Sequence, residues 1–223
     1  MHTLIISDIH LGSSVSRTKE LLKLLNTETY KTLILNGDIF DDLDFTRLDH
    51  DAWQVLSKIR DLSSPKHGID VVWITGNHDG GANILSRLIG TPVKDEYLFE
   101  WNGKRCLAIH GHQFDQFITH NPILSSIASQ TYLFIQRLDT ERQFISRYLK
   151  RISKSWLRVS ERVAQGAVRR GKLMGADIVF CGHTHKAMEK EIQGIQYYNS
   201  GCWTDIPSTY ILIGDSEIIL KEV

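Results

Sequence analysis

The amino-acid sequence predicts an α/β fold, because short apolar runs alternate with segments of helical periodicity over its first half. Strand, helix and strand in succession are typical of parallel βαβ units. The pattern changes after Tyr97, where two apolar runs flank the turn Asn102–Gly103 and predict a hairpin. Strand signals interrupted by glycines return near the end of the chain. These observations predict a sheet from each half of the chain, with helices outside.

The predicted elements are justified in chain order by composition and spacing. Runs rich in Leu, Ile and Val predict buried strands, and Trp53, Leu56 and Ile59 mark one face of a helix. In order, we predict strand 3–7, helix 17–25, strand 32–36, helix 49–62, strand 71–75, helix 82–89, hairpin strands 98–101 and 105–109, strand 178–181 and further strands within 192–223.

Length and composition narrow the class of protein. At 223 residues and 42% hydrophobic content, the chain suits one domain with a substantial core. Its formal net charge is zero, so bulk charge favours neither nucleic acid nor a membrane. The 3 cysteines are expected to be free thiols, which fits a reducing cytosol. There is no signal-peptide pattern and no apolar run of the ~20 residues that span a membrane, so we expect a cytoplasmic protein.

A long segment between Pro122 and Gly166 contains no other glycine or proline and is helical in pattern. Its apolar stripe consists of Ile145, Leu149, Ile152, Trp156, Val159 and Val163. From Arg137 to Lys172 there are 11 Lys or Arg against 3 Asp or Glu, an excess of eight positive charges within a neutral chain. We interpret residues 121–172, approximately, as a helical cap inserted into a single domain over 1–223.

Five short polar motifs each follow a predicted strand. They are Asp8-Ile9-His10, Gly37-Asp38-Ile39-Phe40-Asp41, Gly76-Asn77-His78-Asp79, His110-Gly111-His112 and Gly182-His183-Thr184-His185. Ligands of open α/β sheets bind outside the carboxyl ends of strands, so we expect the motifs to share one rim. Each motif alone is a weak signal, since a lone histidine or a Gly-Asp turn is common. Five in order predict a metal site.

Carboxylate, amide and imidazole ligands suit Mn²⁺, Fe or Zn²⁺. Two ions ~3.5–4 Å apart can hold both the attacking and the leaving oxygen of a phosphoryl displacement. One ligand must bridge them, and a carboxylate can do this whereas an imidazole cannot. Asp38 is the natural bridge, because it ends a strand on a Gly-Asp turn.

The five motifs resemble those of the calcineurin-like metallophosphoesterase superfamily, over Asp8 to His185. The resemblance implies a four-layer α/β/β/α sandwich and two divalent ions, expected to be Mn²⁺, with Fe or Zn²⁺ as alternatives. It implies these ligands: Asp8, His10, Asp38 and His185 for the first ion, and Asp38, Asn77, His110 and His183 for the second. It further implies that His78 contacts the phosphate and assists the leaving group. Asp41 is expected to orient His78 through its carboxylate.

Within the superfamily the chain is most similar to the UDP-2,3-diacylglucosamine diphosphatase family or a sister branch. The similarity rests on 7–12, on the place of the insert and on 197–204. It implies hydrolysis of a diphosphate to UMP and an acyl-sugar 1-phosphate in lipid A synthesis. One departure is His78, where better-known members carry arginine. Expected substrate-binding residues are His112, Arg147, Lys150, Trp156 and Arg158.

The basic insert suggests an anionic inner-membrane surface as a second partner, beside a phosphorylated small molecule or lipid. Alternatively, its stripe packs on the main domain. Three other functions stay open: a soluble nucleotide phosphodiesterase or phosphatase, a nuclease that grips phosphates with the insert, and a non-catalytic scaffold. No nucleic acid partner is expected, because the aromatic residues follow the helical stripe and form no base-stacking array. The sequence leaves the oligomeric state open.

Overall fold

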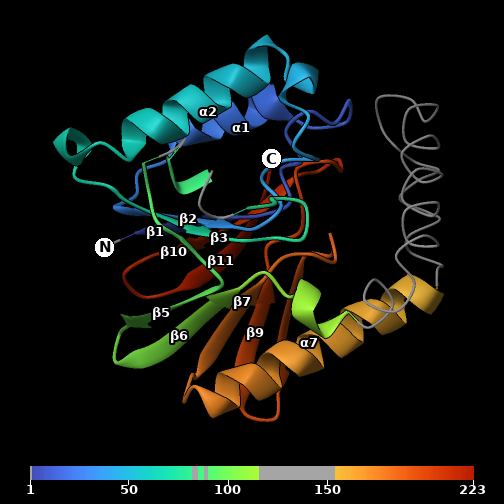
Figure 1. The fold of residues 1–223 in the computed structure, drawn as a ribbon. Coiled ribbons are helices and arrows are strands. Elements are labelled where there is room, and N and C mark those ends of the chain that lie inside the picture. Colours follow the sequence, from blue (N-terminus) through green and yellow to red (C-terminus); the bar gives the residue numbers. More distant parts are fainter. Residues whose placement is uncertain (1, 82–84, 88–89, 116–153) are drawn as a thin grey trace.

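The computed structural model describes residues 2–81, 85–87, 90–115 and 154–223. Two β-sheets pack face to face, and helices cover the outer face of each (Figure 1). Helices α1 (Thr18–Thr27) and α2 (His50–Leu62) lie over the first sheet, and α7 (Lys154–Leu173) lies over the second. The four-layer α/β/β/α fold class is thereby confirmed.

The first sheet has six strands in the order β11-β10-β1-β2-β3-β4. Their bounds are β1 Thr3–Ile6, β2 Thr32–Asn36, β3 Asp70–Ile74, β4 Val93–Lys94, β10 Thr209–Ile213 and β11 Ile218–Glu222. Strands β1 to β4 are parallel, whereas β10 runs antiparallel to β1 and to β11. The predicted βαβ units are therefore confirmed, although the two-residue edge strand β4 carried no periodicity that could predict it. The prediction of one sheet from each half of the chain is wrong for β10 and β11, which pair with β1 and each other in the first sheet.

The second sheet has five strands in the order β5-β6-β7-β9-β8. Their bounds are β5 Glu96–Trp101, β6 Lys104–Ile109, β7 Ile178–Cys181, β8 Met188–Ile192 and β9 Ile195–Asn199. Both turn residues of the predicted hairpin, Asn102 and Gly103, have positive φ, as a type I′ turn requires. Strand β8 starts before the strand signal in the sequence, because this edge strand is mostly exposed and charged.

The helices begin and end close to their predicted bounds. Helix α2 starts at a side-chain cap, since the Asp49 carboxylate accepts the Ala52 N–H at 2.8 Å. Short 3-10 turns occur at Phe45–Arg47, Pro65–His67 and His112–Phe114. Of the predicted helix 82–89, residues 85–87 are described and are helical, and the others lie outside the described residues.

Three apolar clusters hold the layers together. The first lies between α1, α2 and the first sheet and includes Leu21, Leu56 and Trp73. The second fills the space between the sheets, and the third lies between the second sheet and α7. Because burial of apolar surface dominates folding stability, this layered core fixes how the two sheets face each other.

Helix α7 overlaps the last part of the predicted insert. Its residues Val163, Ala164, Ala167 and Val168 are buried, and the last three of them pack in the cluster under the second sheet. This end of the predicted stripe therefore packs on the main domain. The stripe residues Ile145, Leu149 and Ile152 lie outside the described residues, as does the rest of 121–153, and the insert boundaries stay a prediction.

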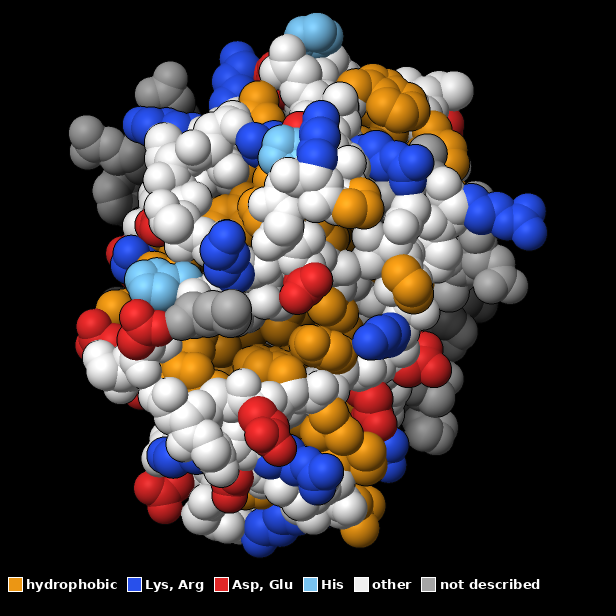
Figure 2. Space-filling model, turned by 90° about the vertical axis from the view of Figure 1, so that its left-hand side faces the viewer, with side chains coloured by type: hydrophobic (Ala, Val, Ile, Leu, Met, Phe, Trp, Pro, Cys, Tyr) orange, Lys and Arg blue, Asp and Glu red, His pale blue; other side chains and the backbone are white. Residues whose placement is uncertain are grey.

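The end of the sandwich beside the N-terminus carries an apolar hollow between the two halves (Figure 2). A cavity of about 320 Å³ at this end is lined by residues that include Thr3, Tyr97, Phe99 and Trp101. The three aromatic residues alternate along β5 and face the space between the sheets. The metal motifs lie at the opposite ends of the strands.

Two expectations from composition concern thiols and membranes. All three cysteines are buried and free of disulfides, which confirms the prediction of free thiols. Burial raises the pKa of Cys106 to about 12, so its thiol stays protonated at neutral pH. Among the residues that the structure describes, no helix combines the length and the apolar character that crossing a bilayer requires.

Candidate metal centre

The five motifs meet at one end of the sandwich, as predicted. Asp8, Asp38 and His78 follow the parallel strands β1, β2 and β3 of the first sheet. His110 and His183 follow the parallel strands β6 and β7 of the second sheet. Because both sets of strands point their carboxyl ends the same way, the polar loops of two sheets face each other across the sandwich.

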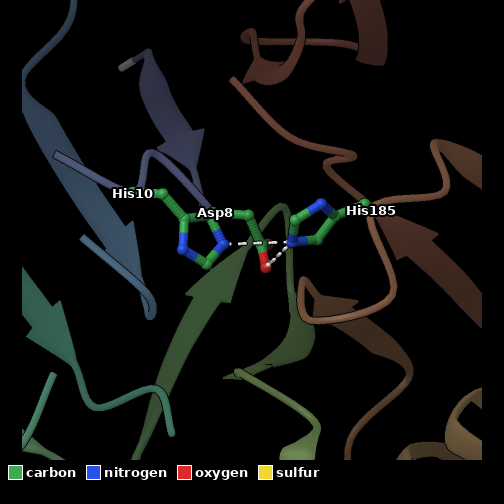
Figure 3. Close-up of side chains that lie close together, drawn as sticks. All are labelled: Asp8, His10 and His185. Carbon is green, nitrogen blue, oxygen red and sulfur yellow. Dashed lines mark hydrogen bonds and ion pairs between the residues drawn. The ribbon is translucent and has the colours of Figure 1, made fainter. Parts of the chain in front are cut away.

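Asp8, His10 and His185 form the first cluster (Figure 3). The Nε2 atoms of His10 and His185 are 3.1 Å apart, and Nε2 of His185 lies 3.3 Å from Oδ1 of Asp8. Asp8 is fully buried, and its carboxylate accepts the main-chain N–H of His183 at 2.9 Å. Two imidazole nitrogens and a buried carboxylate thus converge on one point from β1 and β7.

Asp38, His110 and His183 form the second cluster, with one ligand atom of each within 4.8 Å of the others. Nδ1 of His110 lies 2.8 Å from the carbonyl oxygen of Asn36. A carbonyl can only accept, so Nδ1 carries a proton, and in the neutral ring that metal binding requires Nε2 presents its lone pair. That Nε2 is buried without a hydrogen-bond partner and lies 3.2 Å from Oδ2 of Asp38. A divalent ion bound by both the His110 nitrogen and the Asp38 carboxylate would give this Nε2 a partner.

The backbone is strained at the ligands themselves. Five predicted ligands have left-handed φ angles: Asp8 at 53°, His10 at 52°, Asp38 at 53°, His183 at 66° and His185 at 53°. Such angles are uncommon outside glycine and cluster at functional sites, because surrounding structure must compensate for the strain. The other non-glycine residues with positive φ in the described chain, Asn102 and Gln193, lie in hairpin turns.

Glycines beside the ligands leave room for this convergence. A Cβ on Gly37 would collide with the imidazole of His110, and one on Gly182 would collide with the carboxylate of Asp8. Gly37 also has a φ of 86°, which side chains rarely adopt. Gly37 and Gly182 are therefore required by close approach between loops of different sheets.

The charges of the two clusters favour a bound cation. Burial acts to raise the pKa of the Asp38 carboxyl, but the imidazoles of His110, His10 and His78 outweigh it and hold the pKa well below its usual range. Burial likewise acts to lower the pKa of His110, but Asp38 and Asp8 raise it to about 9. Ionised carboxylates therefore attract positive charge into this enclosed space, and divalent ions would supply it.

The structure corrects how Asp41 orients His78. Nδ1 of His78 lies 2.7 Å from the carbonyl oxygen of Asp41, so the main chain and not the carboxylate holds the ring. The Asp41 carboxylate instead lies 3.6 Å from Nδ1 of His10 and accepts from Nη2 of Arg47 at 2.6 Å. Asp41 thus supports two histidines by different groups. The sequence contained no signal for Arg47.

Asn77 and His78 are both exposed at the rim. The N–H of His78 donates to Oδ1 of Asp38 at 2.8 Å, which ties the Gly76–Asp79 loop to the predicted bridging ligand. Asn77 directly precedes His78 in this loop, and its role as an amide ligand stays a prediction. An exposed imidazole at this position suits contact with a substrate phosphate.

Asp79 organises the loop beneath the ligands. Its fully buried carboxylate accepts four main-chain N–H groups, from Asp38 at 2.9 Å, Ile39 at 2.7 Å, Phe40 at 3.2 Å and Gly76 at 2.9 Å. Burial and the Asp38 charge raise the pKa of Asp79, and these hydrogen bonds oppose that shift. Asp79 therefore positions Asp38.

The segment 197–204 braces the loops that follow β1 and β7. Nδ2 of Asn199 donates to the Gly182 carbonyl at 2.7 Å, and Ser200 Oγ lies 2.7 Å from Ser7 Oγ. The N–H of Trp203 donates to the Asp8 carbonyl at 3.0 Å. These contacts give the segment 197–204 a structural role.

His112 borders the second cluster. Its ring centroid lies 5.5 Å from that of His110 and 6.4 Å from that of His183. Burial, with the charges of these two rings, lowers the pKa of His112 to about 4, so it is neutral at physiological pH. A cavity of about 600 Å³ beside it has His112, Gln113, Thr75, Asp95 and Arg170 in its wall. This position is compatible with substrate contact, which stays a prediction.

Two of the four predicted substrate residues of the insert are described. The indole N–H of Trp156 donates to the carbonyl of Thr184 at 2.9 Å, so this group is used within the protein. Lys186 lies over the same ring, 5.6 Å from its centroid. Arg158 is exposed on α7, and Arg147 and Lys150 lie outside the described residues. Trp156 therefore supports the loop between His183 and His185.

We expect Trp156→Phe to weaken Mn²⁺ binding a few-fold, because it removes the N–H that holds Thr184 but keeps the ring. The lost hydrogen bond should also lower the free energy of unfolding by about 1 kcal/mol. Metal titration and urea unfolding measure the two effects, with the exposed Leu157→Ala as control. A change in KM alone, with native metal binding, would instead support the predicted substrate contact.

Comparisons with known proteins agree with this architecture. Zinc-bound Vps29 from Entamoeba histolytica has a TM-score of 0.53 and 16% identity, over 100% of this chain and 98% of that one. An archaeal phosphodiesterase has a TM-score of 0.56 and 16% identity, over 100% of both chains. The phosphoesterase Yfce from E. coli has a TM-score of 0.54 and 16% identity, over 100% of this chain and 98% of that one. At these identities the likeness shows the fold.

No curated protein sequence matches the chain. A family model, described as the calcineurin-like phosphoesterase superfamily domain, matches residues 1–214. That span includes all five motifs and both clusters of converging side chains. The chain belongs to the calcineurin-like phosphoesterase superfamily.

Proposed function

We propose that this protein is a hydrolase of phosphodiester bonds that works with two divalent metal ions, Mn²⁺ being the expected species. The observation that carries the proposal is the convergence of Asp8, His10 and His185 beside Asp38, His110 and His183. Two bound ions would polarise the phosphoryl group and offset the charge that develops on it. Asp38 is the proposed bridge between them.

His78 is the proposed contact to the phosphoryl group. Its Nδ1–H donates to the Asp41 carbonyl, so the neutral ring presents Nε2 as an acceptor and the protonated ring presents it as a donor. In the protonated form it can hydrogen-bond a phosphoryl oxygen or give a proton to the leaving oxygen. Its exposure at the rim allows substrate to reach it.

We place a water-soluble phosphodiester, such as a nucleotide, first among substrates. Support comes from the described end of the insert stripe, where Val163 is buried and the Trp156 N–H is bonded to Thr184. Val163 packs within the protein and Trp156 is partly buried, so this end of the stripe offers little surface to acyl chains. Support also comes from the archaeal phosphodiesterase and Yfce, which share the fold.

The second candidate is UDP-2,3-diacylglucosamine, cleaved to UMP and an acyl-sugar 1-phosphate. The segments 7–12 and 197–204 and the basic character of 137–172 support it. That basic segment would also bind an anionic membrane surface, at roughly 1 kcal/mol for each residue near it. This candidate would place the protein at the inner membrane and in lipid A synthesis.

The deciding experiment measures turnover of bis-p-nitrophenyl phosphate, of nucleotide phosphodiesters and of UDP-2,3-diacylglucosamine in detergent, each with Mn²⁺. We expect cleavage of the soluble esters, with loss in Asp38→Asn. Strong cleavage of the lipid alone would favour the second candidate, and cleavage of single-stranded DNA would favour a nuclease. No hydrolysis of any ester by metal-loaded protein would contradict the proposed function and leave a scaffold role.

A further inference from the structure

We infer that Asp115 is a positioning residue for the second metal ion, acting through His183. Oδ2 of Asp115 lies 3.1 Å from Nε2 of His183. Asp115 lies outside the five motifs, three residues after His112 in the polar run that follows β6. The inference rests on the proposed dinuclear site, and its test measures metal binding as well as turnover.

The contact is buried and well defined. Asp115 is 6% exposed and directly follows the 3-10 turn His112–Phe114. Its N–H donates to the carbonyl oxygen of His112 at 3.1 Å. The side chains of His183 and Asp115 are 5% and 7% exposed. A charge-assisted hydrogen bond in such a shielded place is stronger than one in water.

This hydrogen bond selects one form of the His183 ring. An ionised carboxylate can only accept, so Nε2 must carry the proton and Nδ1 keeps the lone pair. A ligand atom of His183 lies within 4.8 Å of ligand atoms of Asp38 and His110. We assign Nδ1 as that ligand. Carboxylates that hold the second nitrogen of a metal-binding imidazole fix its tautomer and raise its basicity.

The ring, and not the loop, is what Asp115 controls. The backbone of the loop is already held by other groups, because His183 N–H donates to Asp8 and Asn199 donates to the Gly182 carbonyl at 2.7 Å. The Thr184 carbonyl accepts from Trp156 at 2.9 Å. Removing the Asp115 charge should therefore change the tautomer and rotation of the imidazole while the main chain stays in place.

The two histidines of the second cluster are held through opposite ring nitrogens. The Nδ1–H of His110 donates to the Asn36 carbonyl and leaves Nε2 for the ion. The Nε2–H of His183 donates to Asp115 and leaves Nδ1 for the ion. Each imidazole thus has one nitrogen committed to the protein and one left for the ion. A neutral acceptor supports His110 and a charged one supports His183.

The test is Asp115→Asn, which keeps the shape but removes the charge and allows the amide to present an N–H. We expect one of two Mn²⁺ ions to bind 10–100-fold more weakly by calorimetric titration and metal analysis, with the other ion unchanged. The kcat should fall with little change in KM, and Asp115→Glu should recover part of both. The control is Asp177→Asn, an exposed carboxylate that accepts the Arg105 N–H at 2.8 Å.

Two results would overturn the inference. Native affinity for both ions in folded Asp115→Asn would show that the carboxylate has no effect on the site, and complete loss of both ions would indicate a role as a direct ligand. The unaltered protein provides a second measurement that does not depend on a variant folding. Long-range ¹H–¹⁵N spectra should show His183 protonated at Nε2, and protonation at Nδ1 alone would contradict the assignment. Neither the metal titrations nor the spectra require a substrate, so the proposed function can fail separately.

Discussion

Replacing Asp38 with asparagine is expected to abolish hydrolysis and to release the bound metal. The carboxylate is 2% exposed, faces Nε2 of His110 at 3.2 Å and carries the lowered pKa of a group that stays ionised. An amide of the same shape cannot supply that charge to two ions. Loss of a group that only supports a ligand weakens binding 10–100-fold, so loss of the bridging ligand should exceed ~100-fold in metal affinity and in turnover.

Turnover and metal content of purified Asp38→Asn measure both effects. Asp70→Asn is the matched control, because Asp70 is an exposed residue at the start of β3, at the far end of the sheet from the site. The stabilisation that Mn²⁺ gives the native protein should also vanish in Asp38→Asn, since a ligand stabilises only the state that binds it. Full activity in a variant that retains two ions would disprove the bridging role.

Replacing Asp79 with asparagine is expected to destabilise the whole protein. Its carboxylate accepts the four N–H groups of Asp38, Ile39, Phe40 and Gly76 with all partners buried or partly buried. An amide turns one acceptor into a donor that faces other donors. A buried N–H left without a partner costs about 1–3 kcal/mol, and a broken buried network costs about 3–5 kcal/mol.

The free energy of unfolding in urea should therefore fall by about 4 kcal/mol, and Tm by roughly 10 °C for a chain of this size. Activity should fall as well, because Asp79 holds the loop that carries the predicted bridging ligand. Asp95→Asn is the control, since its exposed carboxylate accepts only from the Thr75 hydroxyl among the contacts of the described residues, at 3.3 Å. A loss of less than 1 kcal/mol in Asp79→Asn would mean that the loop is held by other groups.

The order of the motifs was sufficient to predict the rim. Each motif follows an apolar run, and parallel strands bring their carboxyl ends to one edge, so Asp8 and Asp38 could be placed together without coordinates. Such placement is a local property, repeated strand by strand. The elements β1, β2, β3 and β7 were found for the same reason, because burial on both faces leaves a continuous apolar run.

Contacts between distant segments could not be predicted in this way. The bond from Asp115 to His183 joins residues 68 apart in the chain, and that from Trp156 to Thr184 crosses 28. Neither residue type signals its partner. The same holds for Asp41, whose main-chain carbonyl and not its carboxylate receives the His78 proton. Main-chain groups are identical at every residue, so only their position in space decides which of them serves a side chain.

The sequence by itself determined the α/β class, the residues proposed as metal ligands and the rim where they meet, because periodicity and strand ends are encoded locally. Tertiary structure decided how the ligands are held. The left-handed φ of Asp8 and Asp38, the tautomers of His110 and His183 and the four N–H groups gathered by Asp79 all depend on two sheets pressed face to face. The protonation and orientation of a side chain are set by its neighbours in space, and those neighbours come together only when the two sheets pack in the folded protein.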